Sequence, residues 1–223
     1  QLIQEQPEVE SVYVSLNNSM PNAMSWSGGE YQPDTLSTAE KKITHTQNYS
    51  ILGAKGCDIF RTLGIKDVHT NKELTIPEDA SSRNLCFISK QFALKMFGTT
   101  QVVGEKIFDY EKNPIKIGAV FQDIKTRDYS ASYPLMIRLE KDIYMHDYIH
   151  KSTFIVFRLK EGVNFNQFNE RFNKEVAPHM NQGNFYFDGF KSFADLRNEL
   201  GVMFGVYNKL RLKLSLEIGR AHV

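Results

Sequence analysis

Alternating apolar and polar positions predict a series of short β-strands. The clearest is Val9–Leu16, in which valine and leucine alternate with serine and tyrosine. Val12, Val14 and Leu16 share one face, and Ser11, Tyr13 and Ser15 share the other. Because successive side chains of a strand point to opposite faces, this pattern predicts a half-buried strand. Similar patterns predict strands at 43–54, 85–88, 107–110, 115–121, 134–139, 153–159 and 185–190.

Residues 84–98 predict a strand followed by a short helix. Ser89 is a good N-cap, because its hydroxyl can accept hydrogen bonds from the free amides of the first helical turn. At the other end, Gly98 can adopt the left-handed backbone conformation that commonly ends a helix. The apolar face of this helix is Phe92, Ala93, Met96 and Phe97. A second short helix is expected over Cys57–Leu63, ended by Gly64.

A phenylalanine stripe predicts a longer helix after residue 163. Its apolar positions recur at steps of three, four and four, which places them on one helical face. They are Phe165, Phe168, Phe172 and Val176. Asn164 is the expected cap and Pro178 the expected end. With strands predicted on both sides, residues 153–190 form a β-α-β unit, and the whole pattern favours an α+β fold.

The last predicted helix carries a strict heptad seam. Ser192 and Asp195 resemble an N-cap with an acidic first turn. The apolar positions then recur at alternating steps of three and four, as in a helix that packs along one narrow stripe. They are Phe193, Leu196, Leu200, Met203, Tyr207, Leu210 and Leu214. The pattern leaves two interpretations open: an amphipathic helix packed on a core, or a seam against another helix.

Composition narrows the class of protein. The chain has 223 residues, enough for one domain or for one domain with a large insertion. The hydrophobic fraction of 41% excludes wholesale disorder. The net charge of +1 provides no overall positive electrostatic field that would attract nucleic acid. No run of about 20 apolar residues predicts a transmembrane helix. Because the chain starts at Gln1 without a signal peptide, we expect it to be an excised piece.

Catalytic motifs are lacking in the sequence. It has no phosphate-binding glycine loop, nucleophile elbow or HExxH helix. His146 and His150 have a spacing that would place two imidazoles on one helical face, but a metal would need a third ligand, so surface histidines are the better interpretation. Asp123, Asp128 and Asp142 are interpreted as solvated charges. We therefore predict no catalytic residue, metal or cofactor in this chain.

The two cysteines, Cys57 and Cys86, do not form a disulfide framework or a CxxC motif. One bridge between them is an alternative in an oxidising compartment. The favoured interpretation is two small, half-buried apolar residues.

Three segments of the sequence carry short motifs. Residues 84–107 contain Ser89, Phe97–Gly98 and Gly104–Lys106. Residues 115–125 contain Gly118, Val120 and Asp123, and residues 53–66 contain Phe60 and Leu63–Ile65. In these residues and in the order of the three motifs, the sequence resembles the MacB-like periplasmic core domain of FtsX-type ABC transporter permeases.

The resemblance implies two lobes and a stalk. Residues 1–48 and 151–192 would form a porter-like β-α-β lobe near the membrane, and residues 49–150 an inserted, sabre-like mixed α/β lobe. Residues 193–214 would be a stalk helix leading to a missing transmembrane helix, which favours the helix–helix interpretation of the seam. Residues 215–223 depart from the family pattern and are expected to be a truncation or an added tail.

The implied function is mechanical. The domain would lie in the periplasm, attached to its own transmembrane helices, and transmit motion driven by a cytoplasmic ABC ATPase to a substrate or a periplasmic adaptor. The permease would be a homodimer or heterodimer, and the isolated piece a monomer. The alternative is a free-standing periplasmic binding protein for a small ligand or peptide, with aromatic strands lining a pocket. An enzyme with an unrecognised site is a third hypothesis, which no motif supports.

Overall fold

The computed structural model describes residues 2–16, 20–21, 27–34, 43–53, 57–76, 84–126, 133–140, 154–180, 187 and 189–199. The chain divides into two compact units, Gln1–Asn164 and Phe165–Val223. The first unit holds the sheet and the helices α1 and α2. The second holds α4 and the beginning of the C-terminal helix.

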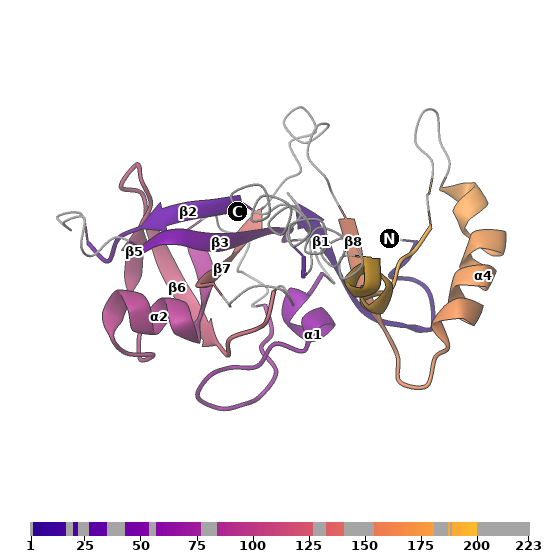
Figure 1. Cartoon of the computed structure of the whole chain (residues 1–223), viewed down its shortest axis with the longest axis horizontal. Helices are drawn as coiled ribbons and strands as arrows, with labels where there is room; N and C mark the ends of the chain where they lie inside the picture. The colour runs from indigo at the N-terminus through magenta and orange to yellow at the C-terminus, as the bar shows by residue number, and fades with distance from the viewer. Residues whose placement is uncertain are drawn as a thin grey trace, which may run out of the picture. The chain divides into compact units, whose positions relative to one another are not determined.

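The eight strands found among the described residues form one mixed sheet (Figure 1). Their order is β5-β6-β4-β7-β3-β1-β8, with β2 paired to β3. The pairs β3/β7 and β4/β6 are parallel, and the other pairs are antiparallel. The strands are β1 (Val9–Leu16), β2 (Ser27–Tyr31), β3 (Ile43–Leu52), β4 (Leu85–Ser89), β5 (Lys106–Phe108), β6 (Pro114–Phe121), β7 (Leu135–Glu140) and β8 (Phe154–Leu159).

Two short helices cover opposite faces of this sheet. Helix α1 (Ile59–Leu63) places Ile59 and Phe60 against one face. There the rings of Phe60 and Phe87 pack edge-on, with their centroids 4.9 Å apart. Helix α2 (Lys90–Phe97) places Phe92 and Ala93 against the other face. Because the residues of β4 alternate between the two apolar clusters, the sheet forms the middle layer of the first unit.

The predicted start and end of α2 are confirmed. Ser89 is its N-cap, and Gly98 at φ 71° is its C-cap. The Asp123 carboxylate, expected to be only solvated, instead accepts a hydrogen bond of 2.8 Å from the backbone N–H of Gln91 in the first turn. A carboxylate is favourable there because the first amides of a helix lack partners within it.

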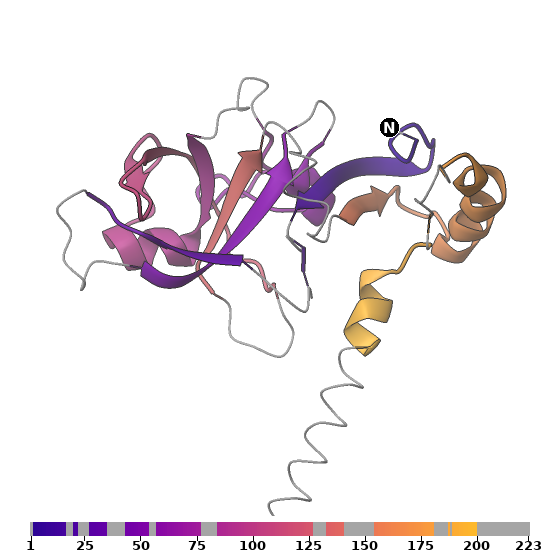
Figure 2. The ribbon, with the colours of Figure 1, turned by 90° about the horizontal axis from the view of Figure 1, so that it is seen from above.

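The prediction of a half-buried β1 is wrong. Ser11, Tyr13 and Ser15, the expected solvent face, are 8%, 0% and 0% exposed. The strand runs antiparallel beside β8 (Figure 2), and Tyr13 joins the cluster that contains α1. The alternation of apolar and polar residues in this strand did not report its burial, because tertiary packing covers both of its faces.

The two cysteines are free thiols, as favoured from the sequence. Cys86 is fully buried in β4, and burial raises the pKa of its thiol to about 12. Cys57 is half-buried beside β1, where its backbone forms a bridge with Val12. Both thiols therefore stay protonated at neutral pH, since burial also raises the pKa of Cys57.

Gly64 should be harder to replace than Gly98. Both have positive φ, 66° and 71°, so alanine costs about 1–2 kcal/mol at either position through backbone strain. A Cβ at Gly64 would also lie 2.8 Å from Nη2 of Arg158, whose Nε donates to the Thr62 carbonyl at 3.0 Å. Displacing that guanidinium gives up a bond of about 1 kcal/mol.

We therefore expect Gly64→Ala to lower the free energy of unfolding by about 2–3 kcal/mol. Gly98→Ala, with nothing within 4 Å of its added Cβ, serves as the control. Chemical denaturation measures both variants. Equal losses would show that Arg158 adds nothing to the constraint at Gly64.

Candidate functional site: the start of the C-terminal helix

The first turns of the predicted stalk helix are described. Residues 193–199 are helical. Of the seven predicted seam positions, Phe193 is 37% exposed and Leu196 is half-buried. The other five, Leu200, Met203, Tyr207, Leu210 and Leu214, lie outside the described residues, so the seam stays a prediction.

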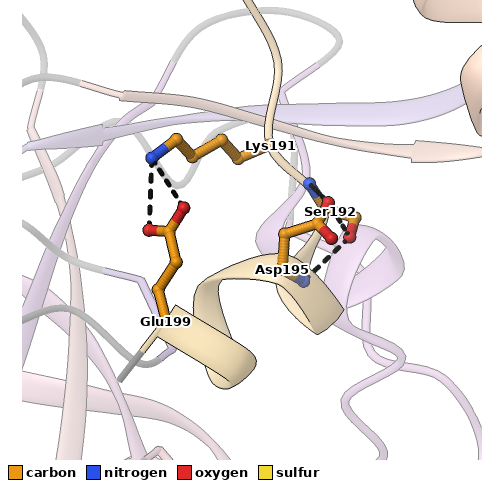
Figure 3. Close-up of polar contacts among 4 residues, drawn as sticks. All are labelled: Lys191, Ser192, Asp195 and Glu199. Carbon is orange, nitrogen blue, oxygen red and sulfur yellow. Dashed lines mark hydrogen bonds and ion pairs between the residues drawn. The ribbon is translucent and has the colours of Figure 1, made fainter. Parts of the chain in front are cut away.

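The helix begins at a reciprocal cap (Figure 3). The Asp195 backbone N–H donates to the Ser192 hydroxyl at 3.0 Å, and Leu196 N–H donates to the Ser192 carbonyl at 3.0 Å. In return, the Ser192 hydroxyl and N–H donate to the Asp195 carboxylate at 2.7 and 3.3 Å. This is the capping-box arrangement, with aspartate in place of the usual glutamate. The predicted roles of both residues at the helix start are thus confirmed.

An ion pair spans the first turns of the helix. The Lys191 ammonium group, just before the cap, contacts both carboxylate oxygens of Glu199 at 3.0 and 3.2 Å (Figure 3). The two side chains are 61% and 56% exposed, so water screens the pair and its contribution to stability is small. The sequence does not indicate this pair, because Lys191 precedes the helix and the i,i+4 spacing of helical ion pairs does not apply to it.

The residues before the cap are anchored in an aromatic cluster. Phe190 stacks on Phe168 with ring centroids 5.8 Å apart and meets Phe172 at 4.7 Å. Phe187 meets Phe172 at 5.5 Å and Phe190 at 4.8 Å. Phe168 and Phe172 belong to α4 (Phe165–Glu175), which continues into the 3₁₀ helix η2 (Ala177–His179). The chain entering the C-terminal helix is therefore packed against the phenylalanine stripe of α4.

This cluster corrects the predicted strand over 185–190. Phe187, Gly189 and Phe190 are its described residues, and none of them lies in a strand. Gly189 has φ 98°, outside the range that ordinary β-strand residues adopt. Phe187 and Phe190, assigned to opposite faces by alternation, consequently point into the same cluster.

The start of the C-terminal helix is fixed by its cap and by aromatic packing. Ser192 and Asp195 fix where the helix starts, and Phe190, two residues earlier, ties that start to α4.

Among the described residues, no group of three or more His, Cys, Asp or Glu side chains is placed to hold a metal ion. His146 and His150 lie outside the described residues. No helix in the described part of the chain is long and apolar enough to span a membrane.

The fold is similar to that of two solved domains, the periplasmic region of MacB and a domain of a putative permease. The periplasmic region of MacB from Actinobacillus actinomycetemcomitans aligns with a TM-score of 0.50 and 13% identity, over 79% of this chain and 70% of that one. A domain of a putative permease from Porphyromonas gingivalis aligns with a TM-score of 0.53 and 17% identity, over 88% and 86%. No family model and no curated protein matches the sequence.

The predicted α+β, MacB-like periplasmic fold is thus confirmed. The division into lobes at residues 48 and 150 stays a prediction. The described strands on both sides of these boundaries belong to the same sheet.

Proposed function

We propose that this chain is the extracytoplasmic domain of an ABC transporter permease, and that it works as a mechanical element. The C-terminal helix would connect the domain to a transmembrane helix and carry motion driven by a cytoplasmic ATPase. The permease would assemble as a dimer. This domain would meet a substrate or an adaptor outside the membrane. The chain itself would contribute no catalytic group.

The observation that carries the proposal is the anchored start of the C-terminal helix. A helix transmits a rotation or shift only if its end is fixed to the body that must move. The Ser192–Asp195 cap and the packing of Phe190 on α4 provide this fixation. The MacB-like fold is the second support, since the solved domains of this fold include the MacB periplasmic region.

The proposal is tested in the full-length protein with charges in the seam. We expect the double variant Leu200→Asp/Leu210→Asp to break the helix–helix contact, because two unpaired carboxylates cannot be buried there without a large cost. ATP hydrolysis by the permease–ATPase complex, measured in lipid nanodiscs, should then fall by about tenfold or more.

Asn198→Asp/Asn208→Asp is the matched control. It places the same side chain on the same predicted helix, at positions away from the predicted seam, and should leave hydrolysis near the unmodified rate. Unchanged hydrolysis in the seam variant would refute the stalk. The flanking gene sequence gives an independent check, because the proposal requires stretches of about 20 apolar residues on both sides of this domain.

A further inference from the structure

The β5–β6 hairpin has one face that is turned away from the core. Ile107 and Ile115, directly opposite each other, are 0% and 2% exposed and belong to the cluster that contains α2. Because side chains alternate along a strand, the neighbouring positions point outward. We define the hairpin face as Lys106, Phe108, Pro114 and Lys116, together with Tyr110 in the turn.

The turn that carries Tyr110 is fixed by hydrogen bonds. The Asp109 carboxylate accepts from the Asn113 N–H at 2.8 Å, and the Asp109 carbonyl accepts from the Lys112 N–H at 3.0 Å. The Lys112 ammonium group donates to the Gln32 side chain at 2.7 Å. Gln32 and Phe108 also exchange backbone hydrogen bonds of 2.9 and 2.8 Å, which tie the hairpin to the end of β2.

This fixed turn displays an aromatic ring to solvent. Tyr110 is 80% exposed, more than any other large hydrophobic side chain in the described part of the chain. Tyrosine is among the residues that contribute most to protein–protein affinity when buried at an interface. A ring held on a fixed turn also loses little conformational entropy on binding.

Two lysines lie side by side on the same face. Lys106 and Lys116 are directly opposite in the antiparallel pair, and both are exposed. Like charges in this position destabilise a sheet. Within the residues that the structure describes, neither ammonium group has a hydrogen bond or an ion pair. The Asp109 and Glu111 carboxylates, by contrast, both accept hydrogen bonds from Asn113.

We propose that the hairpin face is a docking surface for a protein partner that presents carboxylates beside an apolar cleft. The carboxylates would neutralise Lys106 and Lys116, and the cleft would receive Tyr110. A partner of this charge removes the repulsion that the isolated sheet carries. This inference goes beyond the proposed function and does not depend on it.

A protein fits this face better than a membrane does. An anionic lipid surface attracts lysines without needing a defined geometry. The hairpin instead holds Tyr110 on a turn fixed by Asp109, Lys112 and Asn113, which suits a partner of defined shape. Binding to anionic lipid is therefore an outcome that would refute the proposal.

The test uses the full-length protein in the cell that produces it. A photoreactive phenylalanine replaces Tyr110, and in a parallel strain it replaces Tyr133, which is 38% exposed and lies outside the hairpin. We expect a crosslinked adduct of one defined mass from position 110 only. Its yield should fall about tenfold or more when Lys106→Glu/Lys116→Glu is added, and should not change with Lys95→Glu on α2.

Several results would refute the proposal. They are no adduct at position 110, an adduct that survives the double charge reversal, or an adduct that consists of two copies of this chain. The purified protein is also mixed with vesicles of phosphatidylcholine and phosphatidylglycerol in equal parts. Cosedimentation that the double charge reversal abolishes would assign the face to lipid.

A single charge reversal separates docking from a structural role. Lys116→Glu converts the repulsive pair with Lys106 into an attractive one, so the variant should be at least as stable as the unmodified protein. Its crosslinking from position 110 should nevertheless fall. A variant that is destabilised, or one that crosslinks as well as the unmodified chain, contradicts the proposal.

Discussion

Phe172→Ala is expected to loosen the anchor of the C-terminal helix. Phe172 is 0% exposed and contacts the rings of Phe168, Phe187 and Phe190 at 5.8, 5.5 and 4.7 Å. Removing a buried phenylalanine ring costs about 3–5 kcal/mol, because transfer energy is lost and a cavity remains. Amides of α4 should therefore exchange with solvent about a hundredfold faster or more, as measured by hydrogen–deuterium exchange.

The control for this variant is Phe193→Ala. Phe193 is the same type of residue in the same unit, but it is 37% exposed. Its loss should change exchange in α4 by less than about fivefold. If both substitutions accelerate exchange equally, the aromatic cluster is not what holds the helix start to α4.

Ser89→Ala is expected to have the second largest effect. The Ser89 hydroxyl oxygen is buried and accepts two backbone hydrogen bonds, from Phe92 at 3.2 Å and from Leu135 at 3.1 Å. One belongs to the first turn of α2 and the other to the start of β7. Alanine would leave both N–H groups buried without this acceptor, at a cost of about 1–2 kcal/mol for each.

We expect Ser89→Ala to lower the free energy of unfolding by about 2–4 kcal/mol in chemical denaturation. Thr99→Ala provides the comparison. The Thr99 hydroxyl accepts one bond from the Gln101 N–H at 3.2 Å, and Thr99 is exposed, so water can replace it. A loss at Ser89 no larger than that at Thr99 would mean that the hydroxyl does not link the two elements.

The residues that carry the sequence resemblance are mostly structural. Ser89 and Asp123 both accept hydrogen bonds from the first turn of α2, and Gly64 and Gly98 end α1 and α2 in left-handed conformations. Gly104 also has positive φ, 90°. Such positions accept few residue types, because a helix cap needs a side-chain acceptor and a left-handed turn favours glycine. They therefore identify a fold rather than a function.

Local signals determined most of the secondary structure. Periodicity and caps predicted β1, β4, α2, β6 and α4 close to their observed bounds, because these signals act over a few residues. The cap at Ser192 and Asp195 was predicted on the same basis. The seam beyond Glu199 is also a local pattern, and its partner helix remains a prediction.

Only the tertiary structure decided which faces are buried and which distant residues meet. Burial of Tyr13 depends on β8 and α1, which lie far from β1 in sequence. The joint packing of Phe187 and Phe190 depends on the positive φ of Gly189 and on contacts with α4. The sequence by itself determined the start of the last helix, because capping is local, and the resemblance of three segments to the MacB-like family indicated the fold. Packing between distant segments is decided only in the folded chain, because a short stretch of sequence does not specify which distant residues it will contact.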